Sequence, residues 1–185
     1  MSADASAAPA TDPDAASPWG RIIFDALTAA SVGHVTYVPD AGHARLINLC
    51  RAAKSMRTTV LTTEEEGIAV ALGAWLGGER AALLMQSSGV GNCVNMLSLI
   101  ASCRCPFLTV VTMRGEWEEF NPWQEPMGQA TPRAFEIMGV QVLRVEKIED
   151  LAATMAQAGT AFAAGKAVAV LLAQRLIGKK NWVEK

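Results

Sequence analysis

The chain has 185 residues, a length that supports one well-packed core but not two large ones. Its net charge at pH 7 is -2 and its Lys and Arg residues form no cluster, which argues against a nucleic-acid partner. The longest apolar runs fall far short of the roughly 20 residues that a membrane span needs. The hydrophobic fraction of 51% is nevertheless high, which indicates a densely packed α/β domain or a surface buried against another chain.

The four cysteines lie in apolar segments of the sequence. Cys103 and Cys105 lack a second cysteine pair and nearby histidines, which argues against a zinc site. Reduced, buried thiols are typical of cytosolic proteins, and the first residues show neither the basic start nor the apolar core of a secretory signal. The sequence therefore predicts a cytoplasmic protein.

Residues 1–17 are rich in Ala, Ser, Pro and Asp, so we expect a disordered tail there, and a second short tail at 179–185. Between the tails, segments of helical periodicity alternate with short apolar runs. The expected helices are Trp19–Ala30, His43–Lys54, Glu64–Leu76, Gly91–Ser102, 131–138 and Ile148–Ala164. The expected strands are Val35–Val38, 58–62, 81–86, Phe107–Thr112, 140–145 and 167–172. This alternation predicts an α/β domain over 18–178, with a parallel sheet flanked by helices on both faces.

Residues 113–128 are expected to form a long polar loop that contains Trp117, Phe120 and Trp123. Loops of this length inside compact domains are usually functional or disordered, and three bulky aromatic residues argue against disorder. The sequence therefore favours a functional loop.

Two segments, Thr62–Gly67 and Gln86–Asn92, stand out because each follows a run that is typical of a buried strand. In a parallel sheet both segments would lie at the carboxyl edge of the strands, the usual position of a binding crevice. The first segment supplies carboxylates. The second supplies small polar residues and glycines, which let a flat ligand approach the backbone.

The run Glu64-Glu65-Glu66 has two interpretations. Thr63 with Glu66 fits a capping box, and acidic residues in the first turn of a helix gain about 0.3–1 kcal/mol from its dipole. Alternatively, Glu66, or Glu65 with Thr62, caps the helix and leaves Glu64 free to face a crevice. One helix face would then carry Glu64 above a stripe of small residues, namely Gly67, Ala71, Ala74 and Gly78. Such a stripe would allow another backbone segment or a partner chain to pack very close.

The segment Gln86–Asn92 is also ambiguous when it is taken alone. A glycine-rich turn between a strand and a helix commonly binds phosphate through helix amides. The Rossmann glycine pattern and the Walker lysine are both missing, however. The segment is therefore as consistent with a tight turn as with a ligand site.

Taken together, these motifs match a known pattern. Glu64 is followed by Gly73 nine positions later, and the next strand ends in Ser88-Gly89-Val90-Gly91. Further matches of one branch are Val38-Pro39-Asp40, Met85-Gln86, Asn92 and Met127-Gly128-Gln129-Ala130. From about Trp19 to Gln174, the chain resembles the pyrimidine-binding (PYR) domain of thiamine diphosphate enzymes. The likeness is greatest to the α subunit of sulfopyruvate decarboxylase and to the matching half of phosphonopyruvate decarboxylase.

The resemblance implies roles for the candidate residues. Glu64 would bind the aminopyrimidine ring of thiamine diphosphate and promote its activation, with Glu65 or Glu66 in this role if the register shifts. The residues that would line the cofactor and the reacting centre are Gln86, Ser87, Ser88, Gly89, Val90 and Asn92. Asp40 and His43 would reach the substrate, although His43 is equally consistent with an ordinary helix-start residue.

The resemblance also implies a partner chain. The family holds the diphosphate and Mg²⁺ through a second domain with a Gly-Asp-Gly motif, which is not found in this sequence. We therefore expect a separate diphosphate-binding β subunit, a hetero-oligomer with the cofactor at the interface, and no metal ligand in this chain.

For the substrate, the resemblance favours sulfopyruvate, which would yield sulfoacetaldehyde and CO₂. Arg114, and second Arg45, are candidates to bind the anionic end, and both are equally consistent with surface or interface arginines. Phosphonopyruvate decarboxylation and a non-catalytic regulatory PYR-like subunit are the alternatives. A stand-alone nucleotide-binding module is the weakest of the hypotheses.

Overall fold

The computed structural model describes residues 18–178, and the two predicted tails lie outside the described residues. The strands are β1 (His34–Tyr37), β2 (Arg57–Val60), β3 (Ala81–Gln86), β4 (Phe107–Thr112), β5 (Gln141–Val145) and β6 (Ala167–Leu172). The longer helices are α2 (Pro18–Ala29), α3 (Ala44–Ala52), α4 (Glu64–Leu76), α7 (Glu125–Ile137) and α8 (Ile148–Ala163). The short helices are α5 (Ser87–Cys93), α6 (Leu97–Cys103), η1 (Pro122–Gln124) and α9 (Gln174–Ile177).

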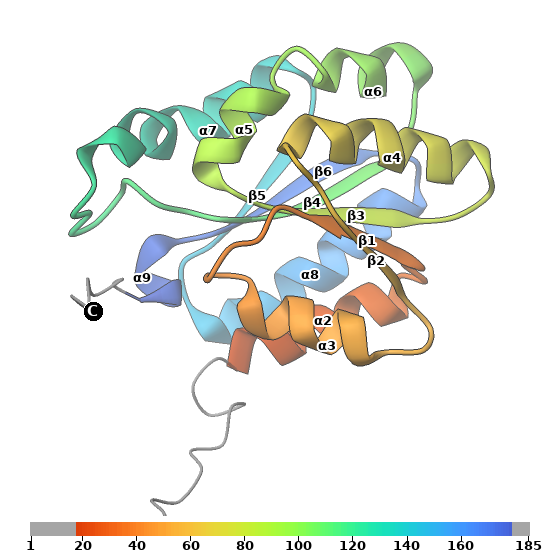
Figure 1. The fold of residues 1–185 in the computed structure, drawn as a ribbon, viewed down its shortest axis with the longest axis horizontal. Coiled ribbons are helices and arrows are strands. Elements are labelled where there is room, and N and C mark those ends of the chain that lie inside the picture. Colours follow the sequence, from red (N-terminus) through yellow and green to blue (C-terminus); the bar gives the residue numbers. More distant parts are fainter. Residues whose placement is uncertain (1–17, 179–185) are drawn as a thin grey trace, which may run out of the picture.

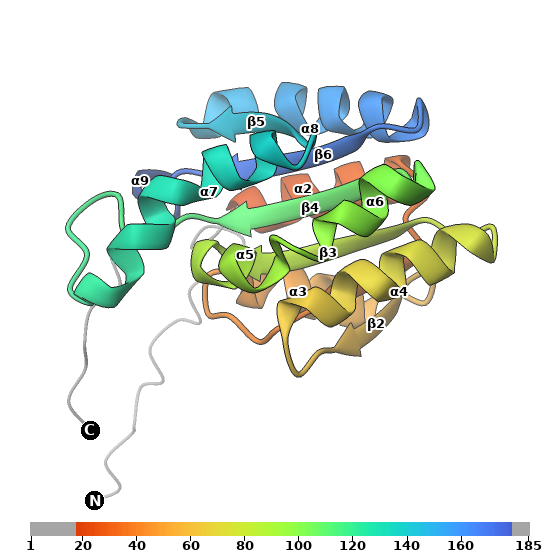
Figure 2. The same cartoon turned by 90° about the horizontal axis from the view of Figure 1, so that it is seen from above.

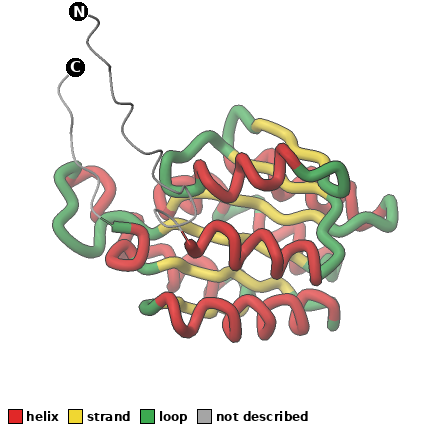
Figure 3. Tube along the Cα trace, turned by 90° about the horizontal axis from the view of Figure 1, so that it is seen from below, coloured by secondary structure: helices red, strands yellow, loops and turns green. Residues whose placement is uncertain are grey.

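The strands form one 6-stranded sheet in the order β2-β1-β3-β4-β6-β5, and every pair in it is parallel. Helices α4, α5, α6 and α7 cover one face, whereas α2, α3 and α8 cover the other (Figure 1). Figure 2 looks onto the first group of helices, and Figure 3 shows the opposite face from below. The predicted fold class, a parallel sheet with helices on both faces, is confirmed.

Each face of the sheet has its own hydrophobic core, because side chains of a strand alternate between faces. On β3, Leu83 and Met85 join the core beneath α4 to α7, whereas Ala82 and Leu84 join the core beneath α2, α3 and α8. Central strands are therefore apolar on both faces, and all residues of β4 are buried. In the described part of the chain, no helix is both long and apolar enough to cross a bilayer.

Three features differ from the prediction. The helix expected at Gly91–Ser102 is divided into α5 and α6, and α5 begins at Ser87, directly after β3. The expected loop of 113–128 is shorter, because η1 and α7 begin within it. Strand β2 lies at the edge of the sheet rather than in its interior, and Val60 is 60% exposed.

Candidate active site

Polar residues from four strand ends gather at the carboxyl edge of the sheet. The register aligns Gln86 of β3 with Thr112 of β4, so the chain leaves both strands at the same level. Asp40, Gln86, Thr112 and Gln174 line a narrow crevice of about 20 Å³ at this edge. In Figure 2 the strand arrows point toward this end of the molecule, where α9 and the start of α7 also lie. The crevice lies where the parallel topology places ligand sites.

Glu64, the first residue of α4, projects over the start of α5. Its Oε2 accepts a hydrogen bond of 2.9 Å from Nδ2 of Asn92, and its side chain is half-buried. It lies directly against the backbone of Gly89, where a Cβ atom would be 2.4 Å from both Cδ and Oε1 of Glu64. The structure thus brings together three residues that the sequence predicted for one site.

Glu66 has a different role in the same helix turn. Its Oε2 accepts a hydrogen bond of 2.9 Å from the backbone N–H of Thr62, and its side chain is exposed. Thr63 is the N-cap but makes no side-chain capping bond, and Glu66 binds the amide of Thr62 rather than that of Thr63, so the predicted capping box is not formed. Glu66 therefore satisfies the helix start, and Glu64 is left to face Gly89. This geometry favours Glu64 over Glu66 as the residue that contacts a ligand.

The small-residue stripe of α4 packs closely on this chain's own sheet at its central residues, which agrees with one of the two alternatives that the sequence left open. Gly67 and Ala71 are buried against this chain's own sheet. A Cβ atom at Gly67 would lie 2.5 Å from Cδ1 of Leu83 and 2.9 Å from Cδ1 of Leu61. The stripe allows α4 to approach the sheet closely, which sets the height of Glu64 above α5.

Two residues of the segment after β3 do not face the crevice. The Ser87 hydroxyl is fully buried, and it accepts a hydrogen bond of 3.0 Å from the backbone N–H of Arg114. Val90 is fully buried in the core between the sheet and α4 to α7. α5 turns both side chains inward, and the contacts of Ser87 and Val90 with a reacting centre or cofactor stay predictions.

The remaining polar residues of the segment form a hydrogen-bonded chain. Asp40 accepts 3.1 Å and 2.8 Å hydrogen bonds from the side chains of Gln86 and Thr112. The Ser88 hydroxyl donates to Oε1 of Gln86 at 3.1 Å. Asp40 and Gln86 line the crevice and are half-buried, and Ser88, which is also half-buried, extends the chain beyond it.

His43 is buried and does not reach the crevice. It stands at the start of α3, and its Nε2 lies 3.1 Å from the carbonyl oxygen of Met85. Its ring packs at an edge-to-face angle against Trp19. Burial lowers the pKa of His43 despite the opposing effect of nearby Asp40, which favours the neutral ring. These contacts agree with the alternative of a helix-start residue, and the substrate role of His43 stays a prediction.

Arg114 lines the same crevice and is paired within the chain, so its contact with the anionic end of the substrate stays a prediction. It forms an ion pair with Glu119, and the two side chains are only 11% and 3% exposed. Burial raises the pKa of Glu119, but hydrogen bonds from Arg114 and from the amides of Asn121 and Gly115 outweigh burial and lower the pKa to about 2. Arg45 packs its side-chain stem against Gly20 of α2.

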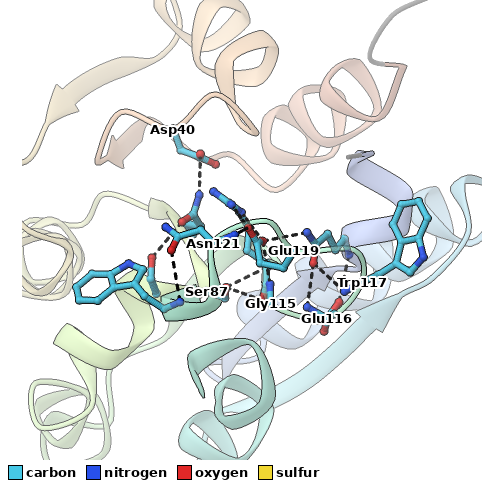
Figure 4. A network of polar contacts seen from close by, with 12 residues as sticks. Asp40, Ser87, Gly115, Glu116, Trp117, Glu119 and Asn121 are labelled. Atoms are coloured by element: carbon cyan, nitrogen blue, oxygen red, sulfur yellow. Dashed lines mark hydrogen bonds and ion pairs between the residues drawn. The ribbon is translucent and has the colours of Figure 1, made fainter. Parts of the chain in front are cut away.

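The residues after Arg114 form a polar network that the sequence did not predict (Figure 4). Oε1 of Gln174 accepts hydrogen bonds of 2.9 Å and 3.0 Å from the amides of Glu116 and Trp117, and its Nε2 donates to Glu119 at 3.1 Å. The Glu116 carboxylate in turn binds the Arg144 guanidinium at 2.7 Å and 3.0 Å. The segment between β4 and η1 is thus an ordered part of the edge.

Thr112 and Gln174 were missed as site residues, although one weak signal was present. Each is a polar residue at or just after the end of an apolar strand. Within residues 18–178, no three His, Cys, Asp or Glu side chains come together as metal ligands.

The chain is similar in sequence to known proteins, although no protein-family model matches it. It is 38% identical over 119 residues to sulfopyruvate decarboxylase subunit alpha of Methanococcus maripaludis. The aligned residues cover 64% of this chain and 71% of that subunit. It is 30% identical over 129 residues to the subunit of the same name from Methanocaldococcus jannaschii, and these residues cover 69% of this chain and 76% of that subunit.

Two longer proteins match over part of their length. Phosphonopyruvate decarboxylase of Streptomyces viridochromogenes is 38% identical over 107 residues, which cover 57% of this chain and 27% of that protein. A solved structure, 2-oxoglutarate:ferredoxin oxidoreductase from Magnetococcus marinus, superposes with a TM-score of 0.67 at 14% identity, and covers 86% of this chain and 29% of that one. At this identity the second likeness concerns the fold alone.

Proposed function

Because this chain belongs to the family of sulfopyruvate decarboxylase α subunits, we propose that it is the PYR subunit of a two-chain 2-oxo acid decarboxylase that depends on thiamine diphosphate. The proposed reaction converts sulfopyruvate to sulfoacetaldehyde and CO₂, with one proton taken up at the carbon that loses the carboxylate. The proposed cofactor site lies between this chain and a diphosphate-binding β subunit, which would also hold Mg²⁺.

The observation that carries this proposal is the position of Glu64. Its carboxylate lies at the carboxyl edge of the sheet, over the bare backbone of Gly89, and the Asn92 amide fixes one of its oxygens. A flat heteroaromatic ring can approach such a surface, and a carboxylate can exchange a proton with a ring nitrogen. The residues present therefore fit the aminopyrimidine of thiamine diphosphate. When bound, this cofactor supplies the electron sink for decarboxylation.

Large exposed apolar side chains support a partner subunit. Val60 at the end of the edge strand β2 is 60% exposed, and Leu76 at the opposite end of α4 from Glu64 is 73% exposed. Exposed apolar surface is typical of interaction sites. Since the Arg114 guanidinium is paired with Glu119, the proposal assigns the cation that receives the sulfonate to the β subunit.

A pull-down of the tagged chain from its own cells tests the assembly. We expect a chain with a Gly-Asp-Gly motif to co-elute, and the eluate to release CO₂ from sulfopyruvate in the presence of thiamine diphosphate and Mg²⁺. 3-Phosphonopyruvate is assayed in parallel, and a preference for it would replace the proposed substrate by the alternative.

Two matched variants test the role of Glu64. Glu64→Gln should lower the turnover of the intact complex by about 100-fold or more, because it removes the proton-exchanging group. Glu66→Gln makes the same charge change in the same helix turn and should retain turnover within a few-fold. Equal activity of Glu64→Gln and wild type would refute the catalytic assignment and favour a non-catalytic regulatory subunit.

A further inference from the structure

Four polar side chains at the carboxyl edge form a continuous hydrogen-bonded chain. The Thr112 hydroxyl donates to Oδ2 of Asp40 at 2.8 Å, Nε2 of Gln86 donates to Oδ1 of Asp40 at 3.1 Å, and the Ser88 hydroxyl donates to Oε1 of Gln86 at 3.1 Å. Thr112 is buried, whereas the other three residues are half-buried. The chain of bonds therefore leads from the core to the open edge.

The Asp40 carboxylate determines the orientation of the Gln86 carboxamide. An ionised carboxylate only accepts hydrogen bonds, so the NH₂ end of the amide must face it, and the carbonyl end is left for the Ser88 hydroxyl. The NH₂ group has two N–H bonds, of which Asp40 takes one. The other N–H is a donor for a ligand, and a 2-oxo acid presents oxygen acceptors at its carbonyl and carboxylate groups.

Asp40 is itself held in place by the surrounding backbone. A Cβ atom at Gly42 would lie 2.6 Å from Oδ2 of Asp40 and 3.1 Å from Cγ2 of Thr112. The contact between Asp40 and Thr112 therefore requires a residue without a side chain at position 42. The carbonyl oxygen of Asp40 accepts a hydrogen bond of 3.1 Å from the amide of His43. Gln86 and Thr112 are register partners in β3 and β4, which fixes their separation.

We propose that Thr112 is a positioning residue of the decarboxylase, which acts through Asp40 to hold the second N–H of Gln86 toward an oxygen of the bound 2-oxo acid. Thr112 does not touch the substrate, and Gln86 makes the contact. This inference rests on the proposed function, because it requires a 2-oxo acid at the crevice. The hydrogen-bonded chain itself can be tested without the reaction.

The kinetic test uses the complex with its β subunit and compares variants of two threonines on β4. Thr112→Val removes the hydroxyl that binds Asp40, and Thr112→Ser retains it. Thr109→Val is the matched control, because the buried Thr109 hydroxyl donates to the carbonyl oxygen of Leu83 at 2.8 Å, outside the network. Both valine variants lose one buried hydrogen bond from the same strand.

We expect Thr112→Val to lower kcat/KM for sulfopyruvate about tenfold and to leave the KM for thiamine diphosphate within twofold of wild type, as loss of one hydrogen bond to a charged group predicts. Thr112→Ser should restore kcat/KM, and Thr109→Val should retain it. Unchanged kcat/KM in Thr112→Val, or an equal loss in Thr109→Val, would overturn the inference. If Thr112→Val does not fold, Asp40→Asn tests the same step, because an asparagine no longer forces one orientation on Gln86.

A second readout is independent of turnover. In the ¹⁵N-labelled full-length chain, the side-chain amide signal of Gln86 should exchange with solvent at least tenfold faster in Thr112→Val and in Asp40→Asn than in wild type or Thr109→Val. An unchanged signal in the first two variants would overturn the inference even for an active enzyme. If these two variants exchange faster but the wild-type complex consumes no 2-oxo acid, the proposed function and the substrate contact are rejected. Only the hydrogen-bonded network is then retained.

Discussion

Replacement of Gly89 by alanine should reduce catalysis while leaving the fold intact. Gly89 is buried under the Glu64 side chain, and a Cβ atom there would lie 2.4 Å from Cδ and Oε1 of Glu64. Non-bonded carbon atoms prefer separations of about 3.5–4.0 Å. The carboxylate must therefore retreat by roughly 1 Å or rotate away from the backbone of residue 89, which also breaks its hydrogen bond with Asn92.

The size of the effect follows from this displacement. A misplacement of about 1 Å in an active site can cost about 100-fold in rate, which corresponds to about 2.7 kcal/mol of transition-state stabilisation. The same substitution replaces a glycine inside α5 by the best helix former, a gain of about 1 kcal/mol. This gain offsets a lost surface hydrogen bond of about 0.5–1.5 kcal/mol, so the free energy of unfolding should change by less than about 1 kcal/mol.

The assay measures kcat/KM for sulfopyruvate in the complex and the urea midpoint of the isolated chain. Gly91→Ala is the control, because it makes the same change two residues further along α5, where the nearest side-chain atom is Sδ of Met127 at 3.3 Å. We expect this control to retain activity. Wild-type kcat/KM in Gly89→Ala would refute the placement of Glu64, and a large loss of stability would show that α5 itself had been disrupted.

Three further outcomes concern stability and reactivity. Glu119→Gln should lower the free energy of unfolding by about 3–5 kcal/mol in urea at neutral pH, because the buried Arg114 guanidinium loses its partner. Since the pKa of Glu119 is lowered to about 2, this stabilisation is present above pH 4.5 and lost toward pH 2, where the variant and wild type should converge. Burial lowers the pKa of His34 from 6.5, so the folded state disfavours the charged ring. The stabilisation by the neutral ring is therefore lost as pH falls below 6.5. In His34→Gln the free energy of unfolding should depend less on pH in this range. Burial raises the pKa of Cys93 to about 12, so a thiol reagent near neutral pH should modify the exposed Cys103 and spare Cys93, as mass spectrometry can show.

Most of the fold could be predicted because its strands are short apolar runs between helical segments. The predicted and observed bounds of β4 are the same, Phe107–Thr112. The start of α5 could not be predicted, because Ser and Gly are poor helix formers and the helix is stabilised by packing of Val90 and Cys93 into the core. The start of α7 was missed because Pro126 was assigned to a loop, although proline fits the first turn of a helix.

The site could be predicted only where the signal was local. Gln86 directly ends a buried strand, and Glu64 directly begins a helix, so topology alone places both at the carboxyl edge. The burial of His43 depends on a carbonyl group 42 residues away, and Gln174 binds amides 57 and 58 residues away. No local pattern reports such distant contacts, which is why the sequence left the role of His43 open and did not indicate Gln174.

The strand order has a consequence for synthesis of the chain. β6 is the last strand, yet it lies between β4 and β5, and in the described sheet β5 pairs with β6 alone. Until Ala167–Leu172 has left the ribosome, β5 has no neighbour and β4, whose residues are all buried in the complete sheet, has an open edge. Unpaired edges of this kind promote aggregation of incomplete chains. We therefore expect nascent chains that stop before residue 167 to bind chaperones strongly, and chains that extend past residue 172 to be released from them.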